Sequence, residues 1–204
     1  MEKIQGWETV EAKGMDDFKA LPIGAYECVI VGAAVHKNEE TGKQSFKVAV
    51  DIASGEYKDY FKKRFDANTN SDKKWDNNAV RYLGFEGDSV AFFKGFITSV
   101  ENSNTGYKWN WDETTLKGKK ICGVFQYEEY EKQDGSKAVK VRLNKFRSMD
   151  KMKDASENLS DNVKLLNGKY MSIDDYNERN DENKQLNDLF GAGIVEIKSE
   201  DLPF

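Results

Sequence analysis

The order of short alternating segments along this chain constrains its fold more than any other feature. In residues 44–52, Phe46, Val48, Val50 and Ile52 alternate with polar or small residues, which is the period of a half-buried β-strand. Four other segments are similarly rich in β-branched and aromatic residues. The expected strands are Tyr26–Val35, Gln44–Ile52, Tyr60–Asp66, Lys119–Tyr130 and Ala138–Phe146.

One stretch between the third and fourth strands has the period of a helix instead. Residues 77–85 and 88–101 are expected to be helical, because apolar residues recur there at spacings of three and four. We assign this apolar stripe to the core. It consists of Val90, Phe92, Phe93, Phe96, Ile97 and Val100.

Three strands, a helical insert and two further strands therefore follow one another. An OB-fold, a five-stranded Greek-key barrel, has this order, with its helix between strands 3 and 4. The sequence thus predicts a mainly β protein built on an OB-fold barrel with a helical insert. An α+β sheet covered by one helical layer fits the same order of elements and stays open as an alternative.

Charge is unevenly distributed along the 204 residues. The net charge is -5, but residues 150–204 hold 13 acidic and 7 basic side chains, which leaves a near-neutral body with a net charge of +1. We expect a lead-in over residues 1–20, an OB-fold domain over 21–149, and an acidic, partly disordered tail over 150–204. Within the tail, residues 172–190 are expected to form a loose helix.

Several site and compartment classes are disfavoured by composition. No apolar run approaches the ~20 residues of a membrane span, and residues 1–14 lack a secretory apolar stretch, so we expect a soluble cytoplasmic protein without a membrane partner. Cys28 and Cys122 lie in expected strands and are interpreted as buried reduced thiols. His36 is the only histidine. We predict no metal, no cofactor and no catalytic residue.

A protein that binds single strands needs cations along the backbone and exposed rings on which bases stack. If Phe61 and Phe65 face the core, Tyr60, Lys62 and Arg64 face outward from the third strand. The loop aromatic residues indicate either a binding surface or a plug over a barrel end, and each basic row alone fits an ordinary solvated exterior. The predicted nucleic-acid-binding residues are Lys47, Tyr57, Tyr60, Lys62, Arg64, Trp75, Tyr107, Trp109, Trp111, Lys140, Arg142 and Lys145.

The last six residues form a second candidate site. Phe204 presents a ring and a main-chain carboxylate together, which suits a partner with an apolar slot beside a cation, and Pro203 restricts the conformations of Leu202. This ending resembles the C-terminal tip with which bacterial and phage single-stranded-DNA-binding proteins recruit replication and repair enzymes. Here only two acids, Glu200 and Asp201, precede Leu202, and Lys198 lies close by.

Residues 22–149 also resemble small phage replication proteins of Gram-positive hosts. The elements that carry this resemblance are Gly24-Ala25-Tyr26, residues 75–96, Leu116-Lys117-Gly118-Lys119-Lys120 and residues 137–146. The resemblance implies a non-catalytic protein of the phage-host cytoplasm that binds single-stranded DNA largely without sequence preference during replication or recombination. It also implies replication or recombination partners for the tip (Glu200, Asp201, Leu202, Pro203 and Phe204), and self-assembly into a homo-oligomer is compatible with it.

Three other functions stay open on the sequence. A strand-annealing or recombination-mediator protein would use the same kinds of residues. A metal-dependent nuclease needs a carboxylate cluster, and no compact Asp/Glu constellation, P-loop or G-x-S-x-G motif is present. An OB-like adaptor that binds only protein would keep the tip and lack affinity for DNA.

Overall fold

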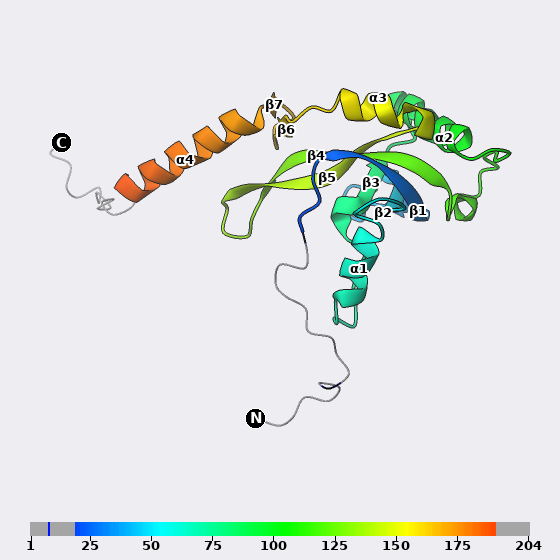
Figure 1. Ribbon diagram of the computed structural model, residues 1–204, viewed down its shortest axis with the longest axis horizontal. Helices are drawn as coiled ribbons and strands as arrows, with labels where there is room; N and C mark the ends of the chain where they lie inside the picture. Colours follow the sequence, from blue (N-terminus) through cyan, green and yellow to red (C-terminus); the bar gives the residue numbers. More distant parts are fainter. Residues whose placement is uncertain (1–7, 9–18, 191–204) are drawn as a thin grey trace.

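A mixed, open β-sheet forms the centre of the molecule (Figure 1). The computed structural model describes residue 8 and residues 19–190, with side chains as far as residue 181. The strands are β1 (Gly24–Lys37), β2 (Gln44–Ile52), β3 (Val80–Leu83), β4 (Lys120–Glu131), β5 (Lys137–Arg147), β6 (Val163–Lys164) and β7 (Tyr170–Met171). Their order is β3-β2-β1-β4-β6-β7, and β5 pairs with the other edge of β4.

The two long hairpins follow the sequence pattern closely. β1 pairs with β2 across the Asn38–Lys43 turn, where the Asn38 side chain accepts bonds from two backbone N–H groups and Gly42 has a φ of 68°. β4 pairs with β5 in the same antiparallel way. The predicted strands over residues 26–35, 44–52, 119–130 and 138–146 are therefore confirmed.

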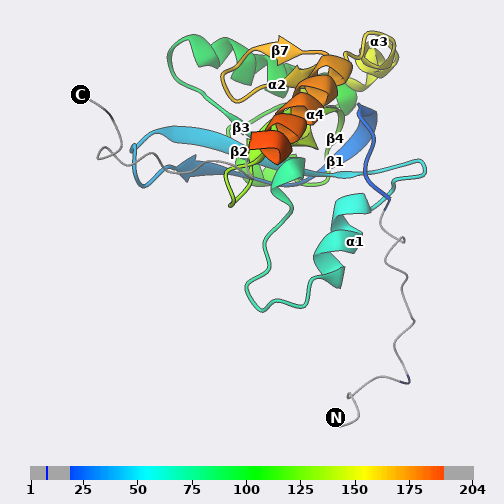
Figure 2. The same cartoon turned by 90° about the vertical axis from the view of Figure 1, so that its left-hand side faces the viewer.

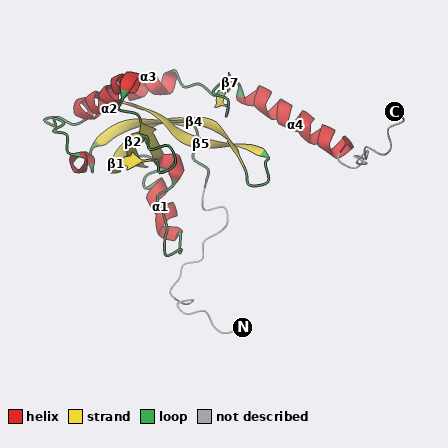
Figure 3. Cartoon of the chain, turned by 180° about the vertical axis from the view of Figure 1, so that it is seen from behind, coloured by secondary structure: helices red, strands yellow, loops and turns green. Residues whose placement is uncertain are grey.

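Helices lie on both sides of the sheet. α2 (Val90–Ser103) and α3 (Met152–Glu157) lie on one side, and α1 (Tyr60–Ala67) extends from the other (Figures 1 and 2). α4 (Ile173–Phe190) points away from the body (Figure 3). Short 3-10 turns connect these elements: η1 (Asn77–Ala79), η2 (Gly87–Ser89), η3 (Glu113–Leu116) and η4 (Met149–Lys151).

The main core lies between the sheet and these helices. Phe61 of α1 stacks on Phe125 of β4 with ring centroids 5.7 Å apart, and Phe96 of α2 packs 4.9 Å from Phe146 of β5. The side chains of β2 that were predicted to face inward are all buried. Val90 and Phe92 are exceptions to the core prediction for α2, because 47% of Val90 and 76% of Phe92 are exposed.

The third predicted strand is wrong, and the helix predicted after it is partly wrong. Residues 60–67 form α1, because Asp51 at the end of β2 accepts bonds from the backbone N–H groups of Phe61 and Lys62. Residues 80–83 form β3, which pairs with β2 and leaves only η1 of the predicted helix over 77–85. The predicted order of three strands, a helix and two strands is still present, but the third strand is β3 and the helix that follows it is α2.

The sheet is open rather than closed into a barrel. β3 and β5 lie side by side, but no ladder of backbone hydrogen bonds joins them in the described part of the chain. We call this gap the seam. The fold is therefore mainly β, with an unpaired edge on each side of the seam.

Residues 150–181 are more closely attached to the sheet than the prediction of a mobile tail implies. β6 pairs in parallel with β4 at Glu128, beyond the end of β1, and Val163, Leu165 and Tyr176 form a second small buried cluster. Buried Glu129 accepts a bond from the Leu166 backbone N–H at 3.0 Å. These contacts fix the start of α4 against the sheet.

Cys28 in β1 and Cys122 in β4 are buried and unpaired, as predicted. Burial raises the pKa of the Cys122 thiol to about 11, which keeps it protonated at neutral pH. Over the described residues, no helix combines the length and the apolar character needed to cross a bilayer.

Candidate nucleic-acid interface

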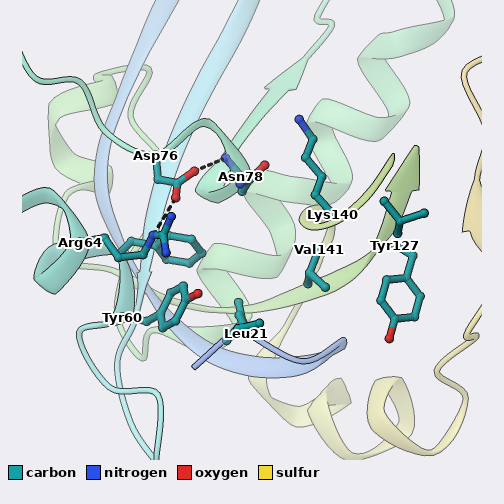
Figure 4. A pocket seen from close by; sticks show the side chains of 11 residues that line it. Leu21, Tyr60, Arg64, Asp76, Asn78, Tyr127, Lys140 and Val141 are labelled. Atoms are coloured by element: carbon teal, nitrogen blue, oxygen red, sulfur yellow. Dashed lines mark hydrogen bonds and ion pairs between the residues drawn. The ribbon is translucent and has the colours of Figure 1, made fainter. Parts of the chain in front are cut away.

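A cavity of about 430 Å³ lies at one end of the seam, where η1, which leads into β3, faces β5. We call it the seam pocket. Tyr60 and Arg64 lie on one side of it and Tyr127 on the other, with Leu21 and Val141 between them (Figure 4). Its lining consists of Ala20, Leu21, Tyr60, Phe61, Arg64, Asp76, Asn78, Tyr127, Val139, Lys140 and Val141.

The first wall depends on the position of α1. Asp51 accepts three backbone N–H bonds, from Ile52, Phe61 and Lys62, at 2.9, 3.0 and 3.1 Å. Its own burial raises the pKa of Asp51 above the ordinary value, against the lowering effect of these donors. The start of α1 is thereby held against β2.

Two predicted site residues share one face of α1. Tyr60 and Arg64 are four residues apart, and the Arg64 guanidinium carbon lies 5.6 Å from the centroid of the Tyr60 ring. Arg64 Nε also donates to Asp76 at 3.3 Å. Asp76 accepts the backbone N–H of Asn78 as well, so the cation, the ring and the turn before β3 are fixed together.

The second wall comes from the β4–β5 hairpin. Tyr127 and Val141 are cross-strand partners, and Val139 lies two residues further along the same face of β5. Lys140 contributes to the lining, but its ammonium lies 4.8 Å from the centroid of the Tyr130 ring. This wall is thus an apolar surface with a phenol at one end and a cation at its margin.

A second, smaller cavity of about 190 Å³ is also lined by Arg64 and Asp76. Phe65, Asn68 and Lys74 complete its lining. The cavities share the Arg64 and Asp76 side chains. The two cavities are therefore neighbours at the Arg64–Asp76 pair.

Lys62, Lys47 and Lys145 are not brought to the seam pocket. Lys62 and Tyr60 would share a face in a strand, but in the helix α1 residues two apart point to different sides. The Lys62 ammonium bonds the exposed Asp66 carboxylate instead. Lys47 lies on the outer face of β2, 5.9 Å from the ring of Tyr82. Lys145 is exposed on β5 opposite Val124.

Two of the loop aromatic residues are held by the body of the protein. Trp75 Nε1 donates to the carbonyl of Val50 at 3.1 Å, and the Trp75 ring packs against the main core. The Tyr107 hydroxyl pairs with Thr115 at 2.9 Å, and Lys119 lies over the Tyr107 ring at 4.5 Å. Both rings close over the core.

The other two tryptophans lie at the end of the sheet near α2. Trp109 packs edge-on to Phe46 with centroids 6.2 Å apart, and its buried Nε1 has no hydrogen-bond partner among the described residues. Trp111 is 81% exposed and has a φ of 67°. We call Trp109, Trp111 and the loop that carries them the tryptophan end.

Tyr57 belongs to an aromatic group beside the seam pocket. It lies edge-on to Tyr26 at 6.1 Å and to Tyr60 at 6.2 Å. The pKa of Tyr26 is raised to about 12, mainly by burial and to a smaller extent by the neighbouring Tyr57. Tyr57 therefore supports the pocket wall from behind.

Arg142 lies on the opposite face of β5 from Val141 and bonds Glu128 at 2.9 Å. The tip residues 200–204 lie outside the described residues. No group of three or more His, Cys, Asp or Glu side chains gathers in the described part of the chain.

No protein-family model matches this chain, and a search of curated proteins finds no similar sequence. The seam pocket and its surroundings thus carry the functional inference.

Sequence reasoning missed Tyr127, Asn78 and Leu21 of the pocket lining, and it also missed the position of Arg81 in β3. Tyr127 alternates with polar neighbours on β4, which predicts that it lies on one face of a strand. The alternation does not indicate that this face lines a cavity. Arg81 and Asn78 fell within the predicted helix over residues 77–85. The pairing of β3 with β2, which sets their positions, joins residues more than thirty apart in sequence.

Proposed function

We propose that this protein binds single-stranded DNA, with bases entering the seam pocket and the backbone following the cations beside it. The observation that carries the proposal is a cavity that combines two phenol rings, Tyr60 and Tyr127, with Arg64 and Lys140. Rings provide stacking surfaces for any base, and cations neutralise phosphates, which gives binding with little sequence preference.

The proposal includes an OB-fold that is open at one position. Strand order 3-2-1-4-5 with β3 beside β5 matches an OB barrel whose last pairing is missing, and α2 follows the third strand as in that fold. The seam is then the place where a barrel of this kind would close.

Recruitment of replication or recombination proteins by the tip is the second half of the proposal. α4 is held to the sheet by the Arg179–Glu129 contact and points away from the body, so its C-terminal end lies away from the sheet. Removing residues 199–204 is expected to leave DNA affinity equal or higher and to abolish capture of a replication or recombination enzyme. A large fall in DNA affinity on truncation would contradict this division.

Fluorescence anisotropy with labelled oligo-dT tests DNA binding. We expect binding that weakens steeply with salt and that resists competition by duplex DNA. Arg64→Gln should lower the slope of log affinity against log salt by about 0.7, the value for one phosphate contact on a single strand.

Lys62→Gln is the matched control, because it removes the same charge from the other side of α1. It should leave the slope unchanged. Equal affinity for duplex and oligo-dT, or no binding at low salt, would overturn the proposal.

A further inference from the structure

Arg81 occupies a position in the seam that an arginine rarely takes. It lies in the middle of β3 opposite Val48 of β2, and because Val48 is fully buried, this face of the pair points toward the core. The side chain is half-buried. Burial lowers the pKa of the Arg81 guanidinium below its ordinary value.

The charges around Arg81 do not balance it. The charged groups that act on it most strongly are Glu128 of β4 and Arg142 of β5. Glu128 is already bonded to Arg142 Nη1 at 2.9 Å, and Lys140 lies directly opposite Glu128 in the β4–β5 ladder. Lys164 of β6 also lies beside Glu128 in the sheet, so one carboxylate has four basic residues around it.

Both arginines keep unused donors. Arg142 Nε is buried without a hydrogen-bond partner, and the Arg81 side chain has no hydrogen bond or ion pair within the described residues. A guanidinium offers five N–H donors in a planar fork, and leaving them unbonded and partly desolvated is unfavourable. An anion with several acceptor oxygens would satisfy both side chains.

We propose that Arg81 and Arg142 form a phosphate-binding site in the seam, separate from the seam pocket, that takes one phosphodiester group of the bound strand. Tetrahedral phosphate suits two guanidinium forks because each can donate two parallel hydrogen bonds. The identity of the ligand as a DNA backbone rests on the proposed function. Affinity for phosphate itself follows from the two arginines alone.

Inorganic phosphate tests the site without DNA. The full chain is titrated with phosphate at constant ionic strength, set with chloride, and the ³¹P line width is followed. We expect saturable broadening with the unaltered chain and with the Lys62→Gln control, and its loss in Arg81→Gln. Arg81→Lys keeps the charge without the fork and should retain only weak broadening.

Thermal unfolding without phosphate separates this role from a structural one. Arg81→Gln removes an unpaired, partly desolvated charge beside Arg142, so its unfolding temperature should equal or exceed that of the unaltered chain. Unfolding at a clearly lower temperature would show that Arg81 supports the fold instead, and would overturn the proposal.

Oligo-dT identifies the source of the phosphate. Arg81→Gln should reduce the salt slope of oligo-dT binding by about 0.7, and an oligonucleotide with an uncharged methylphosphonate backbone should abolish the difference between the variant and the unaltered chain. Phosphate binding without any DNA binding would keep the seam site and refute the proposed function. DNA binding with an unchanged slope in Arg81→Gln, and no saturable phosphate signal, would refute the seam site alone.

Discussion

The seam pocket and the tryptophan end use aromatic rings in opposite ways. At the seam, Tyr60 and Tyr127 line a cavity beside Arg64. At the tryptophan end, Trp109 packs on Phe46 and serves the core, and the cations nearby are engaged locally. The difference shows that a large ring in polar loop sequence can pack against the core. What distinguishes the seam is that rings and a cation share an accessible hollow.

The largest expected effect lies at the tryptophan end. Trp109→Ala removes a half-buried indole from beside Phe46 and should lower the free energy of unfolding by about 3 kcal/mol. Urea denaturation measures this loss. The oligo-dT affinity of the folded protein should change by less than about twofold, because Trp109 does not line the seam pocket. A tenfold loss of affinity with little loss of stability would move the binding surface to this end.

The second effect concerns the small cluster behind Tyr127. Glu129 is 3% exposed, and it bonds Arg179 at 3.2 Å and the Leu166 N–H at 3.0 Å. Glu129→Ala leaves these donors without their acceptor and should destabilise residues 160–181 by about 2 kcal/mol. Amide hydrogen exchange should show faster exchange there, with the β1–β2 hairpin unchanged. Uniformly faster exchange would mean that the small cluster and the main core unfold as one unit.

The third effect is on DNA binding at the seam. Tyr127→Leu keeps apolar contact with Val141 but removes a stacking ring, so oligo-dT affinity should fall by about 1–2 kcal/mol, or roughly 5- to 30-fold. Trp111→Leu is the matched variant, because it removes a ring that is 81% exposed at the other end. It should change affinity less than twofold. The reverse ranking, read by the same anisotropy titration, would refute the seam as the site.

The smallest effect is a pH dependence confined to the tryptophan end. Glu101 accepts the backbone N–H of Trp109 at 2.9 Å, and this bond, with the Lys108 ammonium, holds the pKa of Glu101 below its ordinary value. Because the folded-state pKa is the lower one, this stabilisation is present above the ordinary Glu pKa and is lost as the pH falls through the folded-state value.

Glu101→Gln serves as the reference for that effect. Denaturation of both chains from neutral to acidic pH should show the stability advantage of the unaltered chain shrinking in acid. An advantage that stays constant across this range would rule out the Glu101 carboxylate as its source. The salt slope of oligo-dT binding should be the same in both chains, because Glu101 does not line the seam pocket.

Sequence patterns predict the long hairpins well, because alternation over nine or more residues leaves little choice of period. The patterns give the wrong element for residues 60–67. Phe61 and Phe65 are four residues apart, and residues at this spacing share a face in a strand and in a helix alike. Asp51 decides between the two from a different element. β3 fails for another reason, since four residues are too few to show a period and its partner is β2.

The same limits apply to the candidate site. Tyr60, Arg64 and Lys140 can be chosen from the sequence because they are aromatic or basic residues within expected strands, and the structure brings them to one cavity. Tyr127 and Arg81 cannot, because their importance depends on which strands become neighbours across the seam. The sequence of a single strand does not indicate which strand will lie beside it without pairing.

The open seam also affects how copies of this protein meet one another. An unpaired strand edge ordinarily invites a strand from another molecule. Here β3 is only four residues long with Arg81 at its centre, and β5 carries Lys140, Arg142 and Lys145. Cationic edges of this kind repel each other, so molecules crowded side by side resist joining into a continuous intermolecular sheet.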